Sequence, residues 1–317
     1  MNQYIRPPFQ LLQVIVLIFL IGCDSTTEPQ LIEPVDHIQY FGFTLVDTSW
    51  DDPTDEEFKT NYNNEVAAFS NVADILAVNP EDNIVNRMKA MQELQMKSII
   101  HVNEIFFQIE GTNAPSGTDY KLRADAQERW DTFLDTNSLY LNQDLIQAIY
   151  VGEEPTWNGI SFAELKKVAD YVKLTIPDIT VMVIEAYPTL NEFRIPESVD
   201  WVGFDHYFIK DPKNDATFKA ELQVLKSKLS EEQKLILVMD THYIDFAHGD
   251  FGGIMLNEMG TVATSYYELA KAEPKTIAIL GYFWPSGFDQ ANSIGARHMP
   301  EEVKKEYVKI GKQITDK

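Results

Sequence analysis

From His37 onward the chain repeats one pattern of hydrophobic and polar positions. A short apolar run, rich in β-branched and aromatic residues, ends at a polar or acidic residue and is followed by a longer amphipathic segment. The eight apolar runs are 40–46, 72–78, 98–102, 146–152, 180–184, 201–204, 235–239 and 277–283. Near-continuous apolar strands that alternate with helical segments are typical of a parallel sheet covered by helices. We therefore expect an α/β fold.

The spacing of the runs indicates which α/β fold this is. Helices are predicted over 55–69, 84–96, 122–136, 162–174, 218–229, 262–272 and 301–313. The runs recur about every 34 residues, close to the repeat of a (β/α)8 barrel, which totals about 250 residues. The interval between the third and fourth runs is longer, about 50 residues, and the interval between the fifth and sixth runs is shorter, about 21 residues. An open doubly wound sheet is the alternative, but Asp47-Thr48-Ser49-Trp50 follows the first run in place of a glycine-rich phosphate loop. We predict a single (β/α)8 TIM barrel over residues 36–317.

The N-terminal segment indicates export. Residues 11–21 are apolar except for Gln13, a length too short to span a bilayer comfortably, and they are typical of a signal peptide. The following Leu20-Ile21-Gly22-Cys23 resembles a bacterial lipobox, which implies that Cys23 becomes the lipidated, palmitate-bearing first residue. We predict a signal peptide over 1–22, a tether rich in Ser, Thr, Glu and Pro over 23–35, and an extracytoplasmic domain anchored to a bacterial membrane. The alternative is a short buried helix with an incidental cysteine.

Composition narrows the possible partners. The 317 residues include 49 Asp+Glu against 26 Lys+Arg, a formal net charge of −23. Such a surface repels phosphate backbones and anionic headgroups, so we expect no nucleic-acid partner and membrane contact only through the lipid anchor. The single cysteine excludes an internal disulfide and a zinc site built from several cysteines. The oligomeric state is left open.

Polar and aromatic residues gather where the predicted strands end. In a (β/α)8 barrel the active site lies at the C-terminal ends of the strands. The residues that follow the runs include Asp47, Asn79, Asn103, Glu104, Glu153, Glu154, Glu185, Tyr187, Asp205, His206, Tyr207, Asp240, His242, Tyr243 and Trp284. Each of these residues, taken alone, is explained as a solvent-exposed residue at the end of a strand. Their recurrence around one rim predicts a site.

The most specific motif is residues 150–157, which read Tyr-Val-Gly-Glu-Glu-Pro-Thr-Trp. This motif resembles the clan A (β/α)8 glycoside hydrolases, in which the fourth strand ends in Asn-Glu-Pro or a near variant and the Glu is the acid/base. The resemblance extends to residues 281–284, similar to the aromatic platform under the bound sugar, and to residues 200–207, similar to the sixth strand. It implies a glycosidase with Glu154 as the acid/base. Two positions depart from the family: Glu153 replaces the usual Asn, and Asp240 replaces the usual Glu nucleophile.

Glycosidic cleavage supports the same assignment on chemical grounds. It requires a proton donor and a second carboxylate across the scissile bond, and strands four and seven face each other across a barrel rim. We therefore predict Glu154 as acid/base and Asp240 as nucleophile or base, with Glu185 or Asp205 as alternatives for the second role. Predicted substrate contacts are Asn103, Glu153, Trp157, Glu185, Tyr187, Asp205, Tyr207, His242, Tyr243 and Trp284. We expect no cofactor and no catalytic metal, and stereochemistry is left open because Asp is shorter than Glu.

Two other functions fit part of the sequence. A metal-dependent hydrolase could use His101, His206 and His242 with Asp205 and Asp240, although the first strand lacks a His-x-His pair and no His-Glu-x-x-His occurs. A surface glycan-binding lipoprotein could carry a barrel that has lost its chemistry. The two departures from the family pattern motivate this second alternative.

Overall fold

The structure is a computed structural model that describes residues 37–317. The predicted signal peptide (1–22) and tether (23–35), including Cys23, lie outside the described residues. No helix between His37 and Lys317 combines the length and the apolar character needed to cross a membrane.

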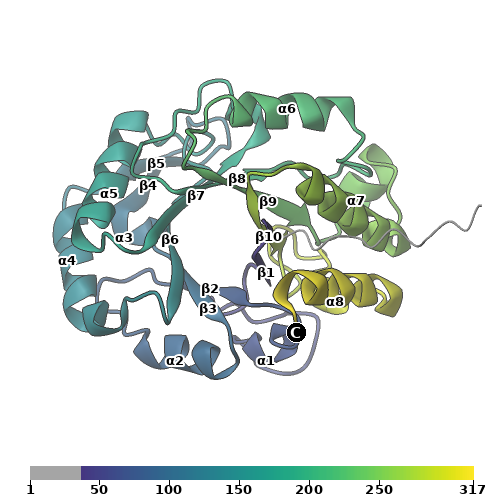
Figure 1. The fold of residues 1–317 in the computed structure, drawn as a ribbon, viewed down its shortest axis with the longest axis horizontal. Coiled ribbons are helices and arrows are strands. Elements are labelled where there is room, and N and C mark those ends of the chain that lie inside the picture. Colours follow the sequence, from purple (N-terminus) through teal and green to yellow (C-terminus); the bar gives the residue numbers. More distant parts are fainter. Residues whose placement is uncertain (1–36) are drawn as a thin grey trace, which may run out of the picture. The chain divides into compact units, whose positions relative to one another are not determined.

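The described chain folds into a ring of eight parallel strands. They are β1 (Tyr40–Phe43), β2 (Val72–Leu76), β3 (Lys97–His101), β6 (Ile146–Glu153), β7 (Thr180–Ala186), β8 (Trp201–Asp205), β9 (Lys234–Asp240) and β10 (Thr276–Tyr282). Hydrogen-bonded neighbours follow the order β1-β10-β9-β8-β7-β6-β3-β2, and a parallel bridge between Asp47 and Ile75 links the two ends. Each predicted run coincides with one strand to within a few residues, and the view in Figure 1 shows the ring. The predicted (β/α)8 barrel is confirmed.

The two ends of the sheet meet closely at β1 and β2. The N–H of Asn71 donates to the carbonyl of Phe41 at 3.0 Å. A Cβ on Gly42 would lie 2.1 Å from the carbonyl oxygen of Val72, so only glycine permits this approach. The sequence therefore closes the barrel with a residue that lacks a side chain.

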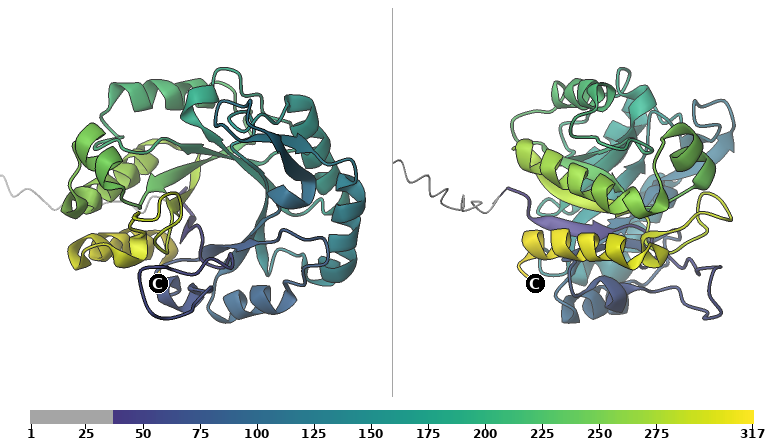
Figure 2. Two further views of the ribbon diagram at one scale, coloured as in Figure 1. Left: turned by 180° about the vertical axis from the view of Figure 1, so that it is seen from behind. Right: turned by 90° about the vertical axis from the view of Figure 1, so that its right-hand side faces the viewer.

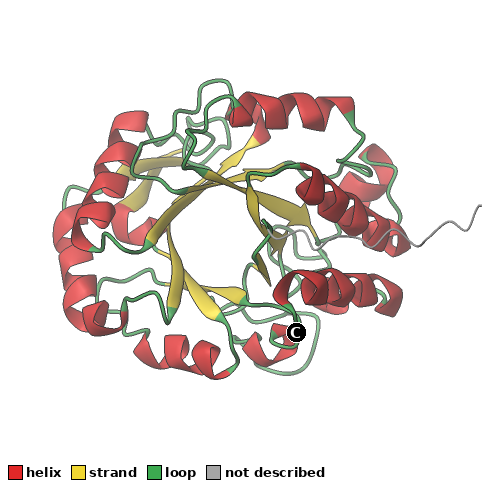
Figure 3. Cartoon of the chain, viewed as in Figure 1, coloured by secondary structure: helices red, strands yellow, loops and turns green. Residues whose placement is uncertain are grey.

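Helices surround the ring on its outer face (Figure 3). They are α1 (Asn63–Val66), α2 (Val85–Glu93), α3 (Asn103–Phe106), α4 (Ala126–Asn137), α5 (Phe162–Thr175), α6 (Ala216–Lys226), α7 (Met259–Ala272) and α8 (Glu301–Thr315). Six of the seven predicted helices are present with small shifts. The helix predicted over 55–69 is reduced to α1, because the carboxylates of Asp52 and Asp55 accept the N–H groups of Thr54 and Glu57 and form turns instead.

Both unusual intervals have a structural cause. The long one holds a hairpin, β4 (Phe107–Gly111) paired antiparallel with β5 (Asp119–Leu122). The short one, between β7 and β8, contains only the 3-10 turn η2 (Tyr187–Thr189) in the described chain. The hairpin adds a wall above β3, and the missing helix leaves the loop after β7 short.

Strand alternation divides the core into two layers. On β9, Ile236 and Val238 belong to an apolar cluster made of strand residues inside the barrel, whereas Leu237 and Met239 pack with the surrounding helices. Figure 2 shows the helices lying along the outside of the strands from behind and from the side. Because the inner cluster fills the barrel below, side chains at the strand ends line whatever space opens above it.

Candidate active site

A cavity of about 400 Å³ opens at the C-terminal ends of the strands. Its floor includes Ile184, Val238 and Leu280 from the inner apolar cluster. Above this floor, Glu153, Glu154 and Asp205 line the wall. The cavity therefore lies where the fold predicts an active site, and four of the predicted site residues line it, namely Glu153, Glu154, Asp205 and Tyr207.

The backbone brings two adjacent glutamates to the same cavity. Neighbouring residues of a strand ordinarily face opposite sides of the sheet, but the pairing of β6 with β7 shifts register between Tyr150 and Gly152. Glu154 then adopts a left-handed φ of 43°, and its N–H donates to the carbonyl of Ile184 at 2.8 Å. Both carboxyl groups, Glu153 and Glu154, consequently line the cavity.

Glu154 is half-buried and holds its proton tightly. Burial, together with the negative charge of Glu153, raises the pKa of Glu154 to about 8. Asp205, at the end of β8, is buried and shares a hydrogen bond with Glu154. Burial and the charge of Glu154 raise the pKa of Asp205 well above its ordinary value. Two carboxyl groups in contact cannot both ionise easily, so the pair holds a proton near neutral pH.

The wall next to β3 carries polar groups without partners. The Tyr150 hydroxyl donates to Glu153, and burial raises the pKa of Glu153 while His101 opposes that shift. His101 stacks on Tyr150 with ring centroids 4.4 Å apart. The Nε2 atom of His101 and the Oε2 atom of Glu104 are buried and have no hydrogen-bond partner among the described residues. A ligand in the cavity can supply these partners.

Aromatic rings form the remaining walls. Tyr207 and Tyr282 stack with centroids 5.0 Å apart and planes 10° apart, and both line the cavity. Trp50, Tyr120 and Phe288 line it as well. Neither Trp50 nor Tyr120 was predicted from the sequence as a contact, because the loop after β1 and the β4–β5 hairpin reach the cavity only through tertiary folding. Flat apolar faces with polar edges suit sugar rings.

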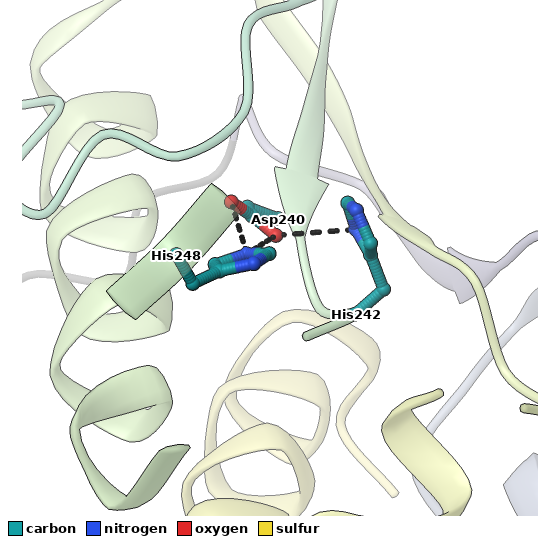
Figure 4. A group of neighbouring side chains, drawn as sticks. All are labelled: Asp240, His242 and His248. Atoms are coloured by element: carbon teal, nitrogen blue, oxygen red, sulfur yellow. Dashed lines mark hydrogen bonds and ion pairs between the residues drawn. The ribbon is translucent and has the colours of Figure 1, made fainter. Parts of the chain in front are cut away.

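Asp240 is fully buried at the end of β9 and does not line this cavity. Its carboxylate accepts the N–H of Phe208 at 2.8 Å and contacts His248 at 3.2 Å and His242 at 3.3 Å (Figure 4). These histidines hold the pKa of Asp240 well below its usual range. The His242 ring packs perpendicular to Tyr282, so the cluster lies behind the tyrosine pair. The role predicted for Asp240 as nucleophile or base stays a prediction.

The same three side chains have the spacing of a metal site, since one donor atom from each lies within 4.8 Å of the others. Their hydrogen bonds indicate another purpose. The N–H of Ile244 donates to His248 Nδ1 at 2.9 Å, which leaves the proton of a neutral ring on Nε2, facing Asp240. His242 Nδ1 lies 3.2 Å from the carbonyl oxygen of Tyr282 and also near the carboxylate of Asp240. Because both of these neighbours are acceptors, Nδ1 is the nitrogen that carries the proton. The cluster is arranged to hold a carboxylate.

Four further predicted contacts lie away from the large cavity. Glu185 is buried and accepts the N–H groups of Thr156 and Trp157 at 2.8 and 3.1 Å, so it holds the loop after β6. Asn103 is buried, and its Oδ1 lies 3.4 Å from the N–H of Glu153. Trp284 belongs to the outer core, where its ring packs 4.9 Å from Phe43. Tyr243 is buried and stacks 4.9 Å from His248.

A second hollow lies on the other side of the two central carboxyl groups. It has a volume of about 290 Å³ and shares Glu154 and Asp205 with the larger cavity. Trp157 and Tyr187 line it, and Tyr187 stacks on His206 with centroids 3.7 Å apart. The predicted contacts Trp157 and Tyr187 therefore lie beside Glu154, outside the larger cavity.

Comparison with known proteins places the fold. No protein-family model matches the sequence, and no curated protein matches it. Solved structures do match the fold. A glucosidase from Croceicoccus marinus gives a TM-score of 0.59 at 12% identity, covering 88% of this chain and 67% of that one. Xylanase 10B from Thermotoga maritima gives 0.55 at 13% identity, covering 89% and 96%. The GH113 β-mannanase AaManA from Alicyclobacillus acidocaldarius gives 0.54 at 14% identity, covering 89% and 100%.

The fold is thus the (β/α)8 barrel that these glycoside hydrolases share, as the motifs at the strand ends predicted. Identities of 12% to 14% establish the architecture and not a common substrate. The chemistry of this chain has to be argued from its own side chains.

Proposed function

We propose that this protein is a glycoside hydrolase that cleaves a polysaccharide or oligosaccharide, with Glu154 as the acid/base. The observation that carries the proposal is the state of Glu154. It lines an open cavity at the strand ends, its pKa is raised to about 8, and a second carboxyl group, Asp205, lies beside it. A carboxyl group that stays protonated at neutral pH can act as the acid of glycosidic cleavage. The second carboxyl group must lie about 5 Å or more from the acid, so substrate binding has to separate Asp205 from Glu154.

In the proposed reaction the glycosidic oxygen replaces Asp205 as the hydrogen-bond partner of Glu154. Glu154 donates its proton to that oxygen as the bond to the anomeric carbon breaks. Asp205 supplies the second carboxylate, because it lines the cavity where Asp240 does not. A water molecule then delivers hydroxide to the anomeric carbon, and its remaining proton restores the acid.

The proposal is tested by incubating the full-length protein with a panel of polysaccharides and measuring new reducing ends, with product anomers read by NMR. We expect at least one glycan to be cleaved, with one anomer formed first. Glycan binding without any new reducing ends would instead support the non-catalytic glycan-binding alternative. Loss of activity after chelation would support the metal-dependent alternative.

The pH dependence of the reaction follows from the raised pKa of Glu154. The acid must be protonated, so we expect kcat/KM to fall as pH rises through about 8. Because the charge of Glu153 contributes to this shift, Glu153→Gln should move the alkaline limb toward lower pH by about one unit. The measurement is a pH profile of kcat/KM for both proteins. An alkaline limb that stays in place in Glu153→Gln would contradict the assignment of that limb to Glu154.

We also propose that Cys23 anchors the domain to a bacterial membrane on the extracytoplasmic side. The support is the lipobox-like Leu20–Cys23 and the polar tether that follows it. In a bacterial host, the full chain should incorporate labelled palmitate and sediment with membranes. Cys23→Ser should lose the label and leave the membrane fraction, whereas labelling that persists in this variant would show that Cys23 is not the acylated residue.

A further inference from the structure

The larger cavity is strongly acidic. Its lining carboxyl groups are Asp74, Glu104, Glu153, Glu154 and Asp205. No lysine or arginine between residues 37 and 317 lines it, and His101 is its only titratable nitrogen in that range. A cavity walled by one sign of charge, with apolar surroundings, concentrates ligands of the opposite sign. A positively charged ligand would bind to those carboxyl groups that have no other partner.

Three of the five already have partners or a proposed role. The carboxylate of Asp74 accepts the N–H groups of Leu45 and Val46 at 2.9 and 2.8 Å. Asp205 is paired with Glu154, and the proposed chemistry uses both. Glu104 and Glu153 remain, on the side of the cavity next to β3, where one oxygen of Glu153 accepts from the Tyr150 hydroxyl.

This side lacks donors for its buried oxygens. Glu104 Oε2 and Thr48 Oγ1 are buried without a hydrogen-bond partner among residues 37–317, and Thr48 as a whole is only 8% exposed. Both residues line the cavity. Unpaired buried acceptors cost free energy until a ligand supplies donors. An ammonium group offers three N–H donors and a positive charge, which suits a wall that carries several acceptors and neither lysine nor arginine.

The position of this wall relative to Glu154 indicates where the ammonium sits on the ligand. Glu153 directly precedes Glu154, and Glu104, Glu153 and Tyr120 all line this cavity. Burial, together with the charges of Glu104 and Glu153, raises the pKa of Tyr120. The three side chains therefore face one region of the cavity. A sugar whose glycosidic oxygen meets Glu154 presents substituents close to its anomeric carbon to this region. In a 2-amino sugar the amino group is on the carbon next to the anomeric carbon.

We propose that the cavity binds a hexosamine unit with a free ammonium group, held by Glu104 and Glu153, so that the substrate is a glycan containing unacetylated amino sugars. Its cleavage rests on the proposed glycosidase function, but its recognition does not. An N-acetylated unit presents a neutral amide with one N–H at the same place. Uronic or sulfated units bring a negative charge to a wall of carboxylates.

Equilibrium binding to the full-length protein tests the recognition. Glucosamine, galactosamine and mannosamine are compared at pH 6 with their N-acetyl forms and with glucose, galactose and mannose, by calorimetry or ligand-observed NMR. We expect one hexosamine to bind at least about tenfold more tightly than its neutral counterparts, because a charge-assisted hydrogen bond is lost in each of them. Glu104→Gln should remove most of this preference. Glu128→Gln, an exposed carboxylate on α4, should leave it unchanged.

The outcomes separate the two proposals. Equal binding of neutral, N-acetylated and amino sugars, or no binding of any hexosamine, overturns the inference, as does a preference that survives in Glu104→Gln. Cleavage of a neutral glycan without hexosamine preference would retain the glycosidase and reject the amino-sugar site. Hexosamine preference without cleavage of any glycan would retain the amino-sugar site and reject the glycosidase.

Discussion

Glu154→Gln is expected to lower kcat on the natural glycan by about 10²–10⁴-fold, the contribution typical of a positioned general acid. The amide keeps the size of the side chain, but it cannot transfer a proton to the leaving oxygen. The loss should be much smaller on an aryl glycoside with a very acidic phenol, because that leaving group departs without protonation. The measurement is kcat for both substrates with both proteins.

The dependence on the leaving group distinguishes an acid from a structural residue. A variant that was merely distorted would lose activity equally on both substrates. Glu128→Gln, which removes an exposed carboxylate on α4, serves as the control and should match the wild type. Wild-type turnover of the natural glycan by Glu154→Gln would reject Glu154 as the acid.

Asp240→Asn is expected to lower the free energy of unfolding by about 3 kcal/mol, within the range for breaking one partner of a buried charged cluster. The buried carboxylate accepts from Phe208, His242 and His248, and an amide would turn an N–H₂ group toward at least one of these donors. Urea denaturation at pH 7 measures the change. Asp135→Asn, an exposed position on α4, is the matched control and should change stability by no more than about 0.5 kcal/mol.

The same variant separates the two roles considered for Asp240. If Asp240 supports the loop after β8 through the N–H of Phe208, the variant should lose stability first and kcat only moderately at temperatures where it is folded. As a nucleophile, it should leave stability near that of the wild type and abolish turnover. Acid should reduce the stability difference between the two proteins. The pKa of Asp240 is lowered in the folded state, so its stabilising contribution is present above the ordinary carboxyl pKa and is lost as pH falls through the lowered one.

The strands were predictable because burial on both faces leaves a direct record in the sequence. The runs that became β6 and β9 are apolar at nearly every position, since one face fills the barrel and the other packs under helices. The helix predicted over 55–69 failed for the opposite reason. Side-chain to backbone bonds at Asp52 and Asp55 are local competitors of a helix, and hydrophobic spacing does not register them.

The candidate site was predictable only in part. Glu154, Asp205 and Tyr207 were found because strand ends converge at one rim. Asp240 and Trp284 also follow strands, yet each packs away from the cavity. The direction of a side chain just beyond a strand depends on the local turn and on its partners. Proximity to a strand end does not determine that direction.

The sequence by itself determined the number and order of the barrel strands and the acidic motif at the end of β6, because periodicity and short motifs are local. The lipid anchor at Cys23 stays a prediction. Only the tertiary structure decided which carboxyl groups share a cavity. The register shift on β6 turned Glu153 and Glu154 to the same side, and long-range packing placed Asp205 against Glu154 while His242 and His248 enclosed Asp240. Electrostatic coupling depends on distance in space, and residues 154, 205 and 240 are brought within or out of reach of one another only by folding.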